Sequence, residues 1–214
     1  MMKWAGIGVL LVGFPVYAAT ASAAKEAPEA KPAAAAHEDP PEPDDPDLAH
    51  VGGDAPSFRL PAFNPDPKSN GFVALDTYVG TERDDEKSKV LVLSFMASYC
   101  KPCKKEMPYL QQLFTKYQDK GLRVIMVSVD TDEANFPIVQ ELIRTNAVTF
   151  PVLKDRYNLV ARRYLGTKTP LPSLFIVNPN GTVKLVKRGY NEEGGKVLLS
   201  EVQKSLGLPE EPLK

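Results

Sequence analysis

The sequence predicts a single α/β domain in which helices cover both faces of a mixed sheet. Two observations predict this class. The first is a pair of continuous apolar runs, at 90–97 and 122–130, as expected of strands buried on both faces. The second is that the stretches after them carry apolar residues at three- and four-residue spacing, the pattern of helices that pack one face on a sheet. Alternation of the two patterns favours a mixed sheet.

The first strand is expected at 90–97, after an irregular segment, 54–88, that holds a hairpin. A helix should follow at 103–117. Gly121 should end it, because glycine readily adopts the left-handed conformation that terminates helices. The apolar face of this helix consists of Cys103, Met107, Leu110, Phe114 and Tyr117. The second buried strand, 122–130, comes directly afterwards.

Three further helices and a strand pair complete the expected domain. The Asn-Pro-Asn-Gly sequence between two apolar runs indicates the turn of a hairpin. The expected bounds are 133–146 and 156–164 for the helices, 173–178 and 182–187 for the paired strands, and 194–206 for a last helix. Residues 208–214 should form a flexible tail.

Residues 1–23 have the layout of a secretory signal peptide, with Lys3, an apolar centre and small residues at two candidate cleavage sites. The uncharged stretch 4–24 is also just long enough to span a bilayer. Only 7–16 is strongly apolar, and glycine and proline interrupt it. We therefore favour a cleaved signal and keep a membrane anchor as the alternative. Either reading places the rest of the chain in the periplasm or otherwise outside the cytoplasm.

Residues 24–50 are rich in alanine and proline, with eight acidic residues and two basic ones. They have almost nothing to bury, so they are expected to form a disordered tether. The folded domain would then span 51–207, without a histidine, since His37 and His50 lie in the tether. The net charge of the whole chain is −1, which gives no electrostatic reason to expect a nucleic acid partner.

The only two cysteines of the chain, Cys100 and Cys103, lie between the first strand and the first turn of the next helix. Free backbone N–H groups and the helix dipole favour an anion there, so the Cys100 thiol should ionise readily. Residues three apart on a helix are close enough for a disulfide. Cys103 shares the apolar helix face, so we expect it to be buried and Cys100 to be exposed. Cys100 would then attack a partner disulfide, and Cys103 would resolve the mixed disulfide.

Other uses of two cysteines fit the sequence less well. A disulfide across four residues restrains the unfolded chain little, so it is a poor structural staple. A zinc site needs about four ligands, and the domain has no histidine, so no metal is expected. Covalent haem attachment needs a histidine at the position that Lys104 occupies. A peroxidase that works through one cysteine would need a hydroxyl residue three positions before Cys100, where this chain has Ala97. A dithiol redox site without a cofactor remains.

Glu106 lies three residues after Cys103, on the side of the helix that faces the cysteines. One interpretation is an N-terminal glutamate that interacts with the helix dipole. The other is a partly desolvated carboxylate whose pKa is raised and which moves protons during thiol–disulfide exchange. Pro108, inside the same helix, removes a hydrogen bond and should kink it.

Three motifs carry a resemblance to a known family. They are "VGGDAPSFRLP" at 51–61, "LSFMASYCKPCKKEMPYL" at 93–110 and "TPLPSLFIVNPNG" at 169–181. With these motifs the chain resembles the TlpA/ResA-like branch of the thioredoxin superfamily, which consists of exported thiol–disulfide oxidoreductases. The resemblance implies a thioredoxin-like fold, in one domain with an N-terminal extension. The segment 131–149 fits the insertion that distinguishes this branch.

The resemblance also implies roles for single residues. Cys100 matches the nucleophile of the family, Cys103 its resolving thiol and Glu106 its active-site glutamate. Ser94 occupies the position, six residues before the first cysteine, at which thioredoxins carry a buried aspartate.

A second group of residues is expected to contact substrates. Pro172 matches the cis-proline that lies beside the disulfide in this family, and Pro170 is the competing candidate. A cis bond before Pro172 would present the backbone of Leu171 to a substrate chain. Tyr99 stands beside Cys100, where the family usually has tryptophan, so it would alter the surface that partners meet.

The resemblance implies an extracytoplasmic enzyme that reduces protein disulfides, for example in cytochrome c maturation or metal-site assembly. Its expected partners are protein disulfide substrates and a membrane electron donor, and we expect a monomer. Two other interpretations stay open: an oxidase or isomerase that donates disulfides, and a non-catalytic redox-sensing or protein-binding module. The reduction potential of the cysteine pair separates a reductant from an oxidant.

Overall fold

A computed structural model describes residues 48–67, 70–81 and 88–213. The predicted signal peptide or anchor, and nearly all of the predicted tether, lie outside these residues. Among the described residues, no helix combines the length and the apolar character needed to cross a membrane.

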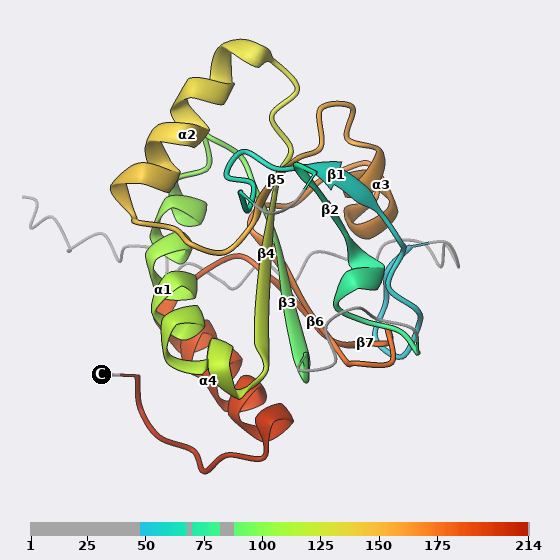
Figure 1. The fold of residues 1–214 in the computed structure, drawn as a ribbon, viewed down its shortest axis with the longest axis vertical. Helices are drawn as coiled ribbons and strands as arrows, with labels where there is room; N and C mark the ends of the chain where they lie inside the picture. Colours follow the sequence, from blue (N-terminus) through green and yellow to red (C-terminus); the bar gives the residue numbers. More distant parts are fainter. Residues whose placement is uncertain (1–47, 68–69, 82–87, 214) are drawn as a thin grey trace, which may run out of the picture. The chain divides into compact units, whose positions relative to one another are not determined.

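A five-stranded sheet forms the centre of the fold, in the order β5-β4-β3-β6-β7 (Figure 1). β3 is parallel to β4, and β4 to β5, while β6 runs antiparallel to both β3 and β7. The bounds are Val90–Met96 for β3, Leu122–Ser128 for β4, Val152–Lys154 for β5, Ser173–Val177 for β6 and Val183–Arg188 for β7. The sheet is therefore mixed, as predicted.

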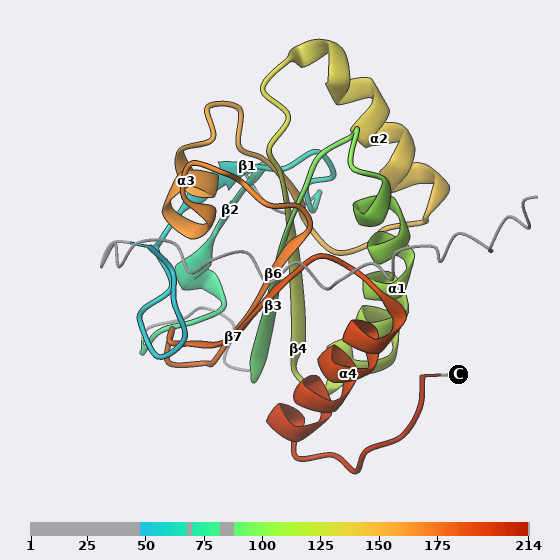
Figure 2. The same ribbon diagram turned by 180° about the vertical axis from the view of Figure 1, so that it is seen from behind.

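Helices and a hairpin cover the two faces of this sheet. α1 (Lys101–Tyr117) and α4 (Glu192–Leu206) lie on one side, with α3 (Leu159–Leu165) and the hairpin of β1 (Arg59–Pro61) and β2 (Phe72–Ala74) on the other (Figures 1 and 2). α2 spans Phe136–Thr145. Within the described residues, short 3₁₀ helices are η1 (Leu75–Thr77), η2 (Gln118–Lys120) and η3 (Glu133–Asn135). Cover on both sides explains why every residue of β3 is buried.

Aromatic side chains fill the core between the sheet and α3. Phe175 of β6 contacts Phe95 of β3 and Tyr164 of α3, with ring centroids 5.8 Å and 5.1 Å apart. Tyr164 also donates a hydrogen bond from its hydroxyl to the carbonyl oxygen of Pro56, so its polar end is satisfied. On the α1 side, Phe114 packs edge-on against Phe150.

The apolar pattern predicted most elements to within a few residues, and one strand was missed. β5 has only three residues; it pairs with Met126–Ser128 of β4 and forms an isolated bridge between Leu153 and Ala62. A run that short gives no periodicity to detect. The third predicted helix begins at Leu159 rather than near 156, because Asp155 accepts hydrogen bonds from the N–H groups of Leu159 and Ala161. α1 continues through Pro108.

Residues 208–213 contact the domain, where the sequence predicted a flexible tail. The Gln203 side chain of α4 exchanges hydrogen bonds with the backbone of Glu211 and donates to the Tyr117 hydroxyl of α1. Leu208 and Leu213 pack against the core. A buried glutamine that pairs with distant backbone leaves no mark in the apolar pattern, so the sequence could not show these contacts.

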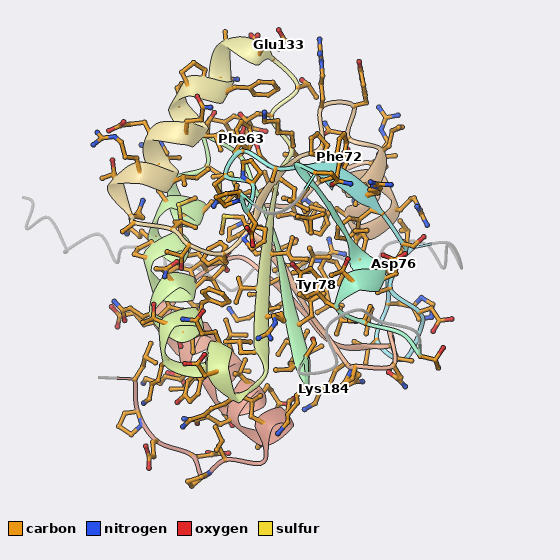
Figure 3. The ribbon with its side chains drawn as sticks, viewed as in Figure 1. Phe63, Phe72, Asp76, Tyr78, Glu133 and Lys184 are labelled. Carbon is orange, nitrogen blue, oxygen red and sulfur yellow. A yellow bond between two sulfur atoms is a disulfide. The ribbon has the colours of Figure 1, made fainter. Side chains whose placement is uncertain are left out.

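The parallel strands point their carboxyl ends toward one edge of the sheet. In Figure 3 the side chain of Glu133, which follows β4, lies at this edge, and Lys184, near the start of β7, lies at the opposite one. Because Ser173 pairs with Phe95 near the end of β3, the segment before β6 also lies at the Glu133 edge. The loops after β3 and β4 and before β6 therefore meet there.

Replacing Phe175 by alanine should destabilise the domain by about 3 to 5 kcal/mol, because the ring is fully buried between two aromatic neighbours. Urea denaturation of the oxidised protein measures this loss. Ile138→Ala, at an exposed position of α2, is the control and should cost less than about 1 kcal/mol. Equal losses in the two variants would contradict the aromatic core.

Candidate active site

Cys100 and Cys103 form a disulfide at the start of α1, with 5.3 Å between their Cα atoms. Cys100 is the N-cap of the helix, and its Sγ accepts a hydrogen bond from the backbone N–H of Cys103 at 3.2 Å. Pro102 occupies the first helical turn, where its missing N–H costs nothing. The Cys100 sulfur therefore lies at the positive end of the α1 dipole, which stabilises a thiolate once the disulfide is reduced.

The two cysteines differ in accessibility, although less than the sequence predicted. Cys100 is 8 % exposed and Cys103 is 0 % exposed. Cys100 is therefore the more accessible sulfur, but it belongs to the buried core in the disulfide state rather than standing free. The side chains that project into solvent here are those of Tyr99, which is 71 % exposed, and of Lys101, Lys104 and Lys105.

A buried carboxylate holds the loop between β3 and Cys100. Asp130, just after β4, accepts hydrogen bonds from the backbone N–H of Ser98 at 2.9 Å and from its hydroxyl at 2.6 Å. It also accepts from the Ser128 hydroxyl at 2.7 Å. All three residues are buried. The sequence analysis did not single out Asp130, and its one signal is an aspartate directly after a buried strand.

Pro172 and its neighbours lie at the same edge of the sheet. The Leu171–Pro172 bond is cis, as the resemblance implied for Pro172 rather than Pro170. The carbonyl oxygen of Pro172 accepts from the N–H of Gly189 at 2.7 Å, and that of Pro170 accepts from the Ser173 hydroxyl. Leu171 is partly buried against the core. Contact between these residues and a substrate stays a prediction.

Glu106 lies on the buried face of α1, three residues after Cys103, and is only 3 % exposed. The hydroxyl of Ser94 donates to its Oε2 at 2.6 Å. Burial raises the pKa of Glu106 from 4.5 to about 7, while the Ser94 hydrogen bond and the charge of Lys187 act in the opposite direction. A carboxyl with this pKa both accepts and releases a proton near neutral pH.

Ser94 completes a pair that the sequence suggested only in part. Ser94 of β3 faces α1, where its hydroxyl meets Glu106. Thioredoxins carry a buried aspartate at the position of Ser94. Here Ser94 is instead the hydrogen-bond donor to a carboxyl group that comes from α1, that of Glu106. No group of three or more His, Cys, Asp or Glu side chains lies close enough to hold a metal ion in the ranges 48–67, 70–81 and 88–213.

Comparisons with known proteins agree with this geometry. The sequence profile of the AhpC/TSA family matches residues 51–186. The thiol-disulfide oxidoreductase ResA of Oceanobacillus iheyensis is 31 % identical over 143 residues, which is 66 % of this chain and 67 % of that protein. ResA of Geobacillus thermodenitrificans is 35 % identical over 106 residues, covering 49 % of this chain and 58 % of that protein. The chain thus spans roughly three fifths to two thirds of these relatives.

Solved structures share the fold. A Chlorobium tepidum protein described as a candidate thiol:disulfide interchange protein DsbE has a TM-score of 0.62 and 27 % identity, covering 74 % of this chain and 99 % of that one. A thiol:disulfide interchange protein from Bacteroides sp. has a TM-score of 0.55 at 22 % identity, covering 77 % and 95 %, and supports the fold alone.

The buried Glu106 should make stability depend on pH. Between pH 4.5 and 7 the folded protein keeps a proton that the unfolded chain releases, so stability falls as the pH rises through this window. Above pH 7 the accumulated cost is about 3 kcal/mol. Glu106→Gln lacks this titration and should be more stable than the wild type at pH 8 by about that amount, and equal to it near pH 4.5. Urea denaturation of both oxidised proteins tests this, and identical pH slopes would contradict it.

Asp130→Ala should destabilise the protein by about 3 kcal/mol, because it leaves one buried N–H and two buried hydroxyls without their acceptor. The matched control is Asp132→Ala. Its exposed carboxylate accepts one hydrogen bond, from the N–H of Ala134, and its loss should cost about 1 kcal/mol or less. Denaturation midpoints of the two variants decide the matter, and a smaller loss for Asp130 than for Asp132 would refute the assignment.

Proposed function

Because the chain belongs to the AhpC/TSA family and is a thiol–disulfide oxidoreductase of the ResA-like kind, we propose that it works as a reductant of protein disulfides outside the cytoplasm. The observation that carries the proposal is the Cys100–Cys103 disulfide at the start of α1, with the proton-binding Glu106 on the buried face of the same helix. The match to ResA of Oceanobacillus iheyensis covers 66 % of this chain.

The first step forms a mixed disulfide. In the reduced protein, the Cys100 thiolate at the N-terminus of α1 attacks one sulfur of a substrate disulfide. A new sulfur–sulfur bond forms between Cys100 and the substrate. The second substrate sulfur leaves with the electron pair of the broken bond and takes up a proton.

The second step releases the substrate and needs a base. Cys103 is fully buried, so its thiol must lose a proton within the protein before it attacks the Sγ of Cys100. Glu106, one helical turn away, is the group placed to take this proton. The attack re-forms the Cys100–Cys103 disulfide and breaks the bond between Cys100 and the substrate, so the substrate sulfur that Cys100 had attacked leaves as a thiolate. In total, two electrons pass from the protein to the substrate.

Three residues are proposed to meet the substrate. Tyr99 presents a largely exposed ring next to Cys100. Leu171 and Pro172 lie at the same edge of the sheet, directly before β6. A substrate that reaches Cys100 would therefore pass between the segment before β6 and the Tyr99 ring.

The location and partners of the protein belong to the same proposal. The signal-like composition of residues 1–23 supports an extracytoplasmic site of action, either after cleavage or with the chain anchored. A thiol reductant outside the cytoplasm must be re-reduced, so a membrane electron donor is the implied partner. Apocytochrome c cysteines and cysteines at metal sites under assembly are the substrate classes that we propose for a monomeric enzyme of this kind.

The reduction potential of the Cys100–Cys103 pair tests the direction of electron flow. Equilibration with glutathione or dithiothreitol buffers should give a value near or below about −270 mV, the potential of thioredoxin. A value near −120 mV, that of a strongly oxidising dithiol, would make the protein an oxidase.

Trapping tests whether the site exchanges with proteins at all. Cys103→Ala should accumulate mixed disulfides between Cys100 and proteins from a cell-envelope extract, since the resolving thiol is gone. The matched control, Cys100→Ala, should trap far fewer, because its remaining cysteine is buried. Equal, low trapping by both variants would favour a non-catalytic module instead.

A further inference from the structure

Lys187, on β7, lies on the face of the sheet from which Ser94 reaches Glu106 of α1, although it is two strands from Ser94. Ser94 of β3 is directly opposite Leu174 of β6, and Leu174 is directly opposite Lys187. Directly opposed residues project from the same face of a sheet. Because the Ser94 hydroxyl meets Glu106, this face is the one that α1 covers. The half-buried Lys187 side chain therefore enters the layer that contains the buried carboxylate.

A glycine in the first turn of α4 makes room for the Lys187 side chain. A β-carbon on Gly194 would overlap Nζ and Cε of Lys187. The neighbouring Gly195 plays a similar part for Tyr109, whose hydroxyl donates to the Gly195 carbonyl oxygen. The Lys187 ammonium thus lies against the helix backbone, in a space that exists because residue 194 has no side chain. We call this space the Gly194 notch.

The N-terminus of α4 does not by itself favour a cation in the Gly194 notch. Helix N-termini carry a partial positive charge and favour anions. Lys187 donates one hydrogen bond there, to the carbonyl oxygen of Gly189 at 3.3 Å, which leaves most of its charge uncompensated by that contact. The buried acidic group on this side of the sheet is Glu106 of α1, and the charge of Lys187 favours its ionised form.

We propose that Lys187, held in the Gly194 notch, is a positioning residue that controls how readily Glu106 gives up its proton. Glu106 is the carboxylate of the proposed exchange reaction, so the consequence for catalysis rests on the proposed function. The electrostatic link between the two side chains does not.

The groups that face Glu106 come from several elements. Ser94 of β3 donates a hydrogen bond, and the charge of Lys187 on β7 opposes the effect of burial on the pKa of Glu106. Tyr190, after β7, has its pKa raised first by its own burial and then by the charge of Glu106. The Tyr109 ring of α1 is tilted against that of Tyr190, with 6.0 Å between the ring centroids, and burial raises the pKa of Tyr109 to about 12. Both tyrosines are therefore neutral near pH 7.

The consequence for the reaction concerns the fraction of Glu106 that is ionised. Only the carboxylate form accepts a proton from Cys103. Burial alone would keep Glu106 protonated at neutral pH, and the positive charge of Lys187 favours the ionised form. Loss of Lys187 should therefore move the onset of fast resolution of the mixed disulfide to higher pH.

Titration of Glu106 in the oxidised protein tests the proposal without relying on exchange activity. In that state the cysteines do not titrate, and the ¹³Cδ resonance of Glu106, assigned by its loss in Glu106→Gln, reports the carboxyl alone. Lys187→Met should raise the midpoint by about half to one pKa unit. The control, Arg188→Met, removes the same charge from the next residue of β7, which is exposed and faces the other side. Equal shifts in the two variants, or no shift in Lys187→Met, would overturn the proposal.

Filling the notch tests the part assigned to Gly194. Gly194→Ala keeps the lysine but displaces its ammonium, and it should raise the Glu106 midpoint in the same direction as Lys187→Met. The double variant Gly194→Ala/Lys187→Met should titrate like Lys187→Met alone, since the substitutions act through one group. A further shift in the double variant would refute the notch. If the Glu106 titrations give the expected shifts but the protein reduces no disulfide, the proposed function is wrong and the electrostatic link between Lys187 and Glu106 still holds.

Discussion

The complete burial of β3 is the constraint on which the rest of the structure depends. β3 has a parallel neighbour on one side and an antiparallel one on the other, with α1 and α4 against one face and α3 against the other (Figures 1 and 2). The chain can leave this strand only at its carboxyl end, where it turns directly into α1. That turn carries Cys100, so burial of the strand fixes where the reactive sulfur emerges.

The same edge gathers the groups that support the disulfide from three separate parts of the chain. Asp130 follows β4 and holds the backbone and hydroxyl of Ser98, two residues before Cys100. Pro172 precedes β6 and is tied by its carbonyl oxygen to Gly189, after β7. Each loop is short and anchored by a buried strand, so the surroundings of Cys100 are held by hydrogen bonds rather than by loop length. A site that must admit a protein substrate and exclude other reactions benefits from such a rigid frame.

Burial of Glu106 links stability to chemistry. A carboxyl surrounded by α1 and β3 costs free energy when it ionises, and this cost places its pKa near 7. The Ser94 hydroxyl limits the cost without removing it. A fully solvated glutamate at this position would not lower the folding stability on ionising, and it would bind no proton at neutral pH. The proton-transfer role that we propose for Glu106 therefore comes with a loss of folding stability.

The sequence by itself determined most of the elements and the position of the cysteine pair. Apolar runs and helical spacing are local properties, so they predicted β3, β4, α1 and the β6–β7 hairpin, and the three-residue separation of Cys100 and Cys103 allowed their disulfide. Tertiary structure alone decided how exposed Cys100 is, that β5 exists, and that Asp130 and Lys187 approach the site. These depend on strand register and on which side chains meet across the fold. Such contacts join residues tens of positions apart, and no local pattern records them.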